Sequence, residues 1–206
     1  MKTTLFFFFT IIAFSQSQTN DLTLRLGMMW TPMFDKKAGG FDFKTDYYIQ
    51  DAVSVGFEFG YTKPHYKQGF GYDTDRTLIN SYRVGIPLQF QVVNTRDFML
   101  SVGVTNGLLF QVLKNKNELV EVEYIDEFGS TIRLEPKKID TDTYYILTPQ
   151  ATAALRLATL DTKDNLELYL SSTIGYQNVL GKGSYTKPSD FSDYIVSLGL
   201  LLKGPF

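Results

Sequence analysis

Apolar and polar residues alternate strictly along several stretches of the chain. Between residues 53 and 61, the odd positions are Val53, Val55, Phe57, Phe59 and Tyr61, and the even positions are Ser54, Gly56, Glu58 and Gly60. Side chains of a β-strand point alternately to its two faces, so this segment has one apolar face and one small, polar face. The pattern predicts a strand that separates an apolar environment from a polar one.

The same alternation predicts eight strands. They cover residues 22–34, 41–49, 53–63, 78–93, 98–113, 144–157, 166–176 and 194–203, of which 41–49 is the least regular. Most reach the roughly 9–11 residues that a tilted transmembrane strand needs, whereas strands of globular domains average about 5–6 residues. We therefore expect an all-β fold, an eight-stranded antiparallel up-and-down transmembrane β-barrel.

The connections between these strands fall into two classes. The short ones, rich in Asp and Asn, are 50–52, 94–97 and 161–165, and the long ones are 35–40, 64–76, 114–143 and 179–191. Short and long connections alternate, as an up-and-down barrel with both chain ends on one side requires. In outer-membrane barrels the short turns face the periplasm and the long loops face outside.

The longest connection, 114–143, has a pattern of its own. Val120, Val122 and Tyr124 alternate with glutamates, and Ile132 and Leu134 follow a turn at 128–130. We expect the flanking strands to continue here as a hairpin that protrudes beyond the bilayer. The alternative is a mobile charged loop, because residues 118–142 contain eight acidic residues.

Alternation alone does not distinguish a membrane barrel from a soluble lipocalin-like barrel with an apolar interior. Here the polar face is rich in Gly, Ser and Thr with only occasional charges, as suits a crowded interior. Aromatic residues gather on the apolar face near the predicted outer rim, in the manner of an interfacial girdle. These residues are Trp30, Phe34, Tyr61, Tyr145, Tyr176 and Tyr194. The apolar face is thus expected to meet lipid.

Several charged residues then point into the barrel. They are Arg25, Glu58, Arg83, Arg156, Glu167 and Lys203. Buried charges persist in proteins when they are paired and hydrogen-bonded, so we expect ion pairs in the interior. Because the interior of an eight-stranded barrel is filled by side chains, these residues are expected to pack the lumen and not to catalyse a reaction.

The N-terminus has the pattern of a cleavable signal peptide. Lys2 supplies the positive start, residues 5–14 are almost entirely apolar, and small residues follow. We expect residues 1–15 to be the signal peptide, with cleavage after Ser15 that leaves Gln16 first, or alternatively after Ser17. Residues 16–206 would then form the barrel. The apolar run is too short to span a bilayer as a helix, which needs about 20 residues.

Composition narrows the function classes further. The 206 residues carry a formal net charge of −2, which provides no electrostatic footprint for nucleic acid. The chain has no cysteine, which excludes disulfides, thiolate metal sites and a lipid-anchored N-terminal cysteine.

The end of the chain is similar to the final strand of outer-membrane barrels. Residues 194–206 alternate and end in Phe206, on the apolar face. With the signal peptide and the loop asymmetry, the chain resembles the small eight-stranded outer-membrane barrels, namely the OmpA transmembrane domain, OmpX and the PorT-like proteins. This resemblance implies an outer-membrane location, a narrow or closed interior, and recognition by the barrel-assembly machinery through the C-terminal strand. It carries over no binding site to this chain.

Candidate catalytic and metal-binding residues are few. Some small barrels are lipid-modifying enzymes that use histidine, and the single histidine here is His65, with Asp73, Asp75, Ser81 and Ser184 as conceivable neighbours. Nothing in the sequence fixes their distances, and one histidine without cysteine lacks the clustered ligands of a zinc site. The glycines of 181–183 and the pair Gly39–Gly40 have the character of turn and loop residues. We predict no catalytic, cofactor-binding or metal-binding residue.

The sequence thus favours an integral outer-membrane protein with a structural or surface-interaction role. Its expected partners are outer-membrane lipid, the assembly machinery and an external molecule at the outer loops. Three alternatives remain: a narrow channel or transport and secretion accessory, a soluble exported lipocalin-like binder, and a lipid-modifying barrel enzyme.

Overall fold

The computed structural model describes residues 21–33, 36–50, 52–64, 77–127, 129–161 and 165–205. Its elements are β1 (Asp21–Met33), β2 (Lys36–Gln50), β3 (Val53–Pro64), β4 (Thr77–Asn94), β5 (Phe98–Asp126), β6 (Gly129–Asp161), β7 (Leu166–Tyr176), β8 (Asn178–Leu180), the short 3₁₀-helix η1 (Pro188–Asp190) and β9 (Tyr194–Pro205). Among these residues, no helix has the length and apolar character needed to cross a membrane. The predicted signal peptide, His65, Asp73, Asp75 and Phe206 lie outside the described residues.

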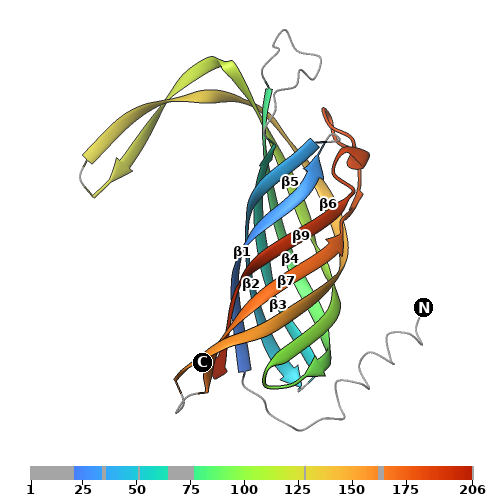
Figure 1. Cartoon of the computed structure of the whole chain (residues 1–206). Helices are drawn as coiled ribbons and strands as arrows, with labels where there is room; N and C mark the ends of the chain where they lie inside the picture. Colours follow the sequence, from blue (N-terminus) through green and yellow to red (C-terminus); the bar gives the residue numbers. More distant parts are fainter. Residues whose placement is uncertain are drawn as a thin grey trace.

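Eight long strands close into a ring (Figure 1). Each of β1 to β6 pairs antiparallel with the next strand in sequence, and β9 closes the barrel by pairing with both β7 and β1. The short strand β8 adds to β6 where β7 has ended. The predicted eight-stranded antiparallel barrel is confirmed.

Apolar side chains cover the outside of the barrel and polar ones fill it. Leu26, Phe57 and Leu198 are exposed on the outer surface, whereas Arg25 and Ser197, their neighbours of opposite parity, are buried. A lipocalin-like binder has the reverse arrangement, with an apolar cavity inside. The lipocalin-like alternative is therefore wrong for this chain.

The long connection between β5 and β6 is a β-hairpin, as predicted. The two strands pair from the barrel out to Asp126 and Gly129, with register shifts at 113–114 and 115–119. In Figure 1 the paired strands leave the barrel at its long-loop end and curve sideways away from it. The alternative of a charged loop without regular structure is wrong.

The long connection predicted at 35–40 is wrong. Residues 36–40, expected in a loop, belong to β2 and pair with residues 29–33 of β1. Gly40 lies so close to β3 that a Cβ atom there would be 1.7 Å from the Tyr61 carbonyl oxygen. Gly40 thus serves close strand packing, and the strict alternation of short and long connections fails at this turn.

Candidate functional site

The lumen contains a layer of buried charges, which we call the charged layer. Its members are Arg25, Asp42, Lys44, Asp46, Glu58 and Arg83, all buried. Three are basic and three acidic, so the layer is formally neutral. The even-numbered residues of β2 supply half of it, and they were missed because segment 41–49 looked irregular. Their alternation with Phe41, Phe43 and Tyr47 was the available signal.

Arg25 lies at the centre of one half of the layer. Its guanidinium pairs with Asp42, donates to Ser171 Oγ over 2.9 Å from Nε, and contacts Ser197. The Ser197 hydroxyl donates in turn to Asp42 Oδ1 at 2.7 Å. These contacts join the four neighbouring strands β2, β1, β9 and β7 on the inside of the barrel. Lys44 and Asp46 extend this half with a 3.7 Å ion pair along β2.

Glu58 lies at the centre of the other half. It pairs with Arg83 from β4 and accepts a 2.7 Å hydrogen bond from the Thr105 hydroxyl of β5. Gln150 of β6 donates to Thr105 at 2.9 Å and reaches Glu58 at 3.5 Å. Four adjacent strands therefore meet at a single carboxylate. The expected interior pairing of Arg25, Glu58 and Arg83 is confirmed.

The remaining three predicted interior charges lie at the short-turn end and are only partly buried. Arg156 bridges Asp97 at 2.6 Å and Glu167 at 3.5 Å. Lys203 lies 3.7 Å from Asp21. The Arg156 pairs fasten the 94–97 turn to the barrel wall, and the Lys203–Asp21 pair joins β9 to β1. Lys203 and Asp46 of the charged layer both pair with Thr23 in strand register, but none of the described ion pairs joins Arg156, Glu167 or Lys203 to the layer.

Apolar clusters lie inside the barrel on both sides of the charged layer. The outer cluster, at the long-loop end, consists of Met33, Ala38, Leu109, Tyr144, Ile146, Val179 and Phe191. The inner cluster, at the short-turn end, consists of Met99, Ala154, Tyr169 and Leu201. The sequence did not predict either cluster, because these apolar side chains stand at positions of the lumen face where the alternation leads one to expect polar residues.

The loop 181–193 lies over the outer cluster and is held down by polar contacts. Asp142 accepts hydrogen bonds from the backbone N–H groups of Ser184, Tyr185 and Thr186, and from the Thr186 hydroxyl, at 2.6–3.1 Å. The Tyr144 hydroxyl donates to the Thr186 carbonyl at 2.7 Å. The loop predicted at 179–191 is therefore fixed on the mouth of the barrel.

Burial alone would raise the pKa of Asp142. The hydrogen bonds from the Thr186 hydroxyl and from the three backbone N–H groups outweigh that effect and lower its pKa below the usual aspartate value. The carboxylate thus stays ionised, the form that accepts these hydrogen bonds.

Two cavities between described residues of the lumen are small. One cavity of about 10 Å³ lies between the outer cluster and Arg83, and one of about 20 Å³ lies between the charged layer and the inner cluster. Each has room for about one water molecule. The interior described here is packed with side chains.

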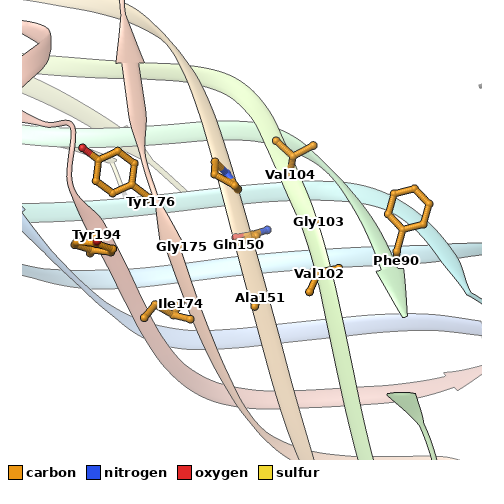
Figure 2. Close-up of a pocket in the computed structure, with 11 residues that line it drawn as sticks. Phe90, Val102, Gly103, Val104, Gln150, Ala151, Ile174, Gly175, Tyr176 and Tyr194 are labelled. Atoms are coloured by element: carbon orange, nitrogen blue, oxygen red, sulfur yellow. The ribbon is translucent and has the colours of Figure 1, made fainter. Parts of the chain in front are cut away.

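A shallow hollow lies on the outer wall of the barrel (Figure 2). It measures about 650 Å³, and the small residues Pro149 and Ala151 lie between the bulkier Phe90 on one side and Tyr176 and Tyr194 on the other. The side chains around it are almost all apolar and none is charged. The hollow can accommodate an alkyl chain, and its lining offers no group for acid–base chemistry.

The residues weighed for chemistry do not come together. Ser81 is inside the barrel, where its hydroxyl accepts a 2.8 Å hydrogen bond from Gln111. Ser184 lies in the outer loop and meets Asp142 through its backbone. Gly181 has a φ of +128°, which confirms the turn predicted at 181–183. In the described part of the chain, no group of three histidine or acidic residues is arranged to hold a metal ion.

Comparisons with solved structures agree with this geometry. Neisserial surface protein A matches with a TM-score of 0.55 at 10% sequence identity, over 90% of this chain and 96% of that one. The outer-membrane protein OprG from Pseudomonas aeruginosa matches with a TM-score of 0.54 at 11% identity, over 90% and 96%. The chain has the fold of the small outer-membrane β-barrels. At these identities the likeness concerns the fold. No family model and no curated protein sequence matches the chain.

Proposed function

We propose that this protein is an integral outer-membrane barrel with a structural or surface-interaction role, and not an open diffusion pore. The observation that carries the proposal is the filled lumen, in which apolar clusters lie on both sides of a neutral, mutually paired charged layer. Eight strands enclose a space just wide enough for side chains, and here side chains occupy it.

The outer surface supports the membrane location. Leu26, Ile86 and Leu200 are more than half exposed on the barrel wall, where water contact would be unfavourable. Tyr145, Tyr176 and Tyr194 cluster near the long-loop end, as interfacial aromatics do. Lipid is the solvent that fits this surface. Recognition of the C-terminal strand by the assembly machinery stays a prediction.

The membrane location is tested by extraction and gel mobility. We expect the mature chain to stay in the membrane fraction after an alkaline wash, and to migrate differently on a gel before and after boiling. Release by the wash, together with identical migration, would contradict both the location and the barrel.

Conductance separates the structural role from the channel alternative. Purified protein reconstituted in planar bilayers should give no stable current steps, whereas a trimeric porin prepared in parallel should. Reproducible steps from the wild-type protein would favour the narrow channel. The variant Glu58→Ala with Arg83→Ala lacks two side chains of the charged layer that fill the lumen. Its current is compared with that of the wild-type protein.

A further inference from the structure

The hairpin outside the barrel has two chemically different faces. Residues that pair across the two strands point to the same side of a sheet. Val120 pairs with Glu135, Val122 with Arg133 and Tyr124 with Thr131, which defines one face. The opposite face combines Leu119, Ile125, Ile132 and Leu134 with Glu121 and Glu123, and we call it the aliphatic face.

The first face satisfies its own polar groups. Tyr124 donates its hydroxyl hydrogen to Glu135, which also accepts from Lys114 Nζ at 3.2 Å. The Arg133 guanidinium lies over the Tyr124 ring, 5.4 Å from its centroid. These contacts leave few groups on this side that require a partner.

The aliphatic face is open. Ile125 is 81% exposed, Ile132 and Leu134 are each 64% exposed, and Leu119 is 52% exposed. Neighbouring side chains of this size form a continuous apolar surface, which on soluble surfaces marks an interaction site. Glu121 and Glu123 lie among these residues and belong to none of the ion pairs described for the chain, and Glu123 accepts a hydrogen bond from the Ser130 hydroxyl on the same face.

Charge decides which kind of partner fits. Residues 114–143 contain eight acidic and five basic residues, a formal charge of −3, and the charged residues of the aliphatic face, Glu121 and Glu123, are both acidic. A second copy of the hairpin would bring like charges together, and anionic lipid headgroups would be repelled in the same way. A protein surface that is apolar and basic complements both features of the aliphatic face.

We propose that the aliphatic face binds a partner protein through a β-strand surface that alternates apolar and basic side chains. The apolar side chains pack on the exposed leucines and isoleucines, and the lysines or arginines pair with Glu121 and Glu123. The proposal rests on the surface-interaction role proposed above and names the partner chemistry for it.

Two designed β-hairpin peptides provide the probe. Both present a row of valines flanked by charged positions on one face, which are lysines in one peptide and glutamates in the other. Binding to the full chain in zwitterionic nanodiscs is measured by fluorescence anisotropy, with empty nanodiscs as the blank. We expect saturable binding of the lysine peptide and at least tenfold weaker binding of the glutamate peptide.

Matched variants locate the binding face. Ile132→Ser with Leu134→Ser should weaken binding of the lysine peptide at least tenfold, and Val120→Ser with Val122→Ser on the opposite face should change it less than threefold. Glu121→Lys with Glu123→Lys keeps the apolar residues and should reverse the preference between the two peptides.

Equal effects of the two serine pairs, or no saturable binding to the wild type, would overturn the proposal. A wild-type oligomer that dissociates in the Ile132→Ser, Leu134→Ser variant would also overturn it, because the aliphatic face would then bind a second copy of the chain. Protection of the hairpin from hydrogen exchange that appears only with anionic lipid would overturn it as well, because the face would then bind the membrane. Gel mobility and membrane fractionation test the barrel and its location separately, so either proposal can fail while the other holds.

Discussion

At the residue scale, the lumen combines charges that would be costly alone. Glu58 and Arg83 are buried side by side, and Thr105 adds a hydrogen bond to the carboxylate. A buried ion pair gains little over a well-packed apolar pair, but removal of one partner leaves an unpaired buried charge. The arrangement therefore makes the two residues dependent on one another, and this dependence is measurable.

Glu58→Gln alone should destabilise the folded barrel by about 3 kcal/mol or more, because Arg83 would stay charged without its partner. Glu58→Gln with Arg83→Met should cost less than the single change, because the second substitution removes the isolated charge. Denaturant unfolding in lipid vesicles measures both values. A double variant that is destabilised more than Glu58→Gln alone would show that the pair is not coupled in this way.

Asp142 is a residue whose ionisation fixes a loop. Its pKa is lowered in the folded protein, so its stabilising contribution is present above the unfolded pKa and is lost as the pH falls through the folded pKa. An unfolded aspartate titrates near pH 4, so the loop 181–193 should stay fixed above about pH 4 and loosen only in stronger acid.

Asp142→Ala should release the loop at neutral pH. Hydrogen bonds to a charged group contribute about 1.5–3 kcal/mol, so hydrogen exchange at the amides of Ser184, Tyr185 and Thr186 should accelerate at least tenfold. Thr141→Ala, next to it on β6, is the control and should leave these amides protected. Unchanged exchange in the Asp142 variant would show that the outer cluster alone holds the loop.

At the element scale, close strand packing depends on particular glycines. A Cβ at Gly40 would be 1.7 Å from the Tyr61 carbonyl oxygen of β3, which is backbone and cannot yield cheaply. A Cβ at Gly60 would be 2.9 Å from the flexible end of Met29. The two positions thus differ in what must move.

Gly40→Ala should destabilise the barrel by about 1–3 kcal/mol, in the range of overpacked cores, and Gly60→Ala should cost clearly less. Denaturant unfolding of both variants in the same lipid gives the comparison. Equal costs would mean that the β2–β3 pair can separate locally without loss of stability.

The same elements show how far the sequence could predict the fold. The alternation of apolar and polar residues at odd and even positions predicted the strands and the outward face. Alternation such as that of residues 53–61 depends only on the side of the strand to which each residue points. It failed at Gly39–Gly40, which were expected in a loop but belong to β2, where Gly40 allows close strand approach. It also missed Asp142 and Phe191, because their contacts join residues about 40 and more positions apart and leave no local pattern.

At the scale of the whole molecule, two exposed apolar surfaces meet different surroundings. Leu26 on the barrel wall is 63% exposed and Ile132 on the hairpin is 64% exposed, so exposure alone does not distinguish them. Their positions do, because β1 crosses the barrel wall whereas the hairpin extends beyond it (Figure 1). We assign lipid to the first surface and the aqueous exterior, with a protein partner, to the second.

An arginine at each position separates the two environments. Leu26→Arg places a charge in the middle of the wall and should destabilise the barrel in lipid vesicles by about 2–4 kcal/mol, the cost for arginine near the bilayer midplane. Ile132→Arg should change stability by less than about 0.5 kcal/mol, as surface substitutions in water do. Unfolding in vesicles measures both, and in detergent micelles, which deform more readily, the difference should shrink. If Ile132→Arg cost as much as Leu26→Arg in vesicles, the hairpin would lie in the bilayer and the division between the two surfaces would be wrong.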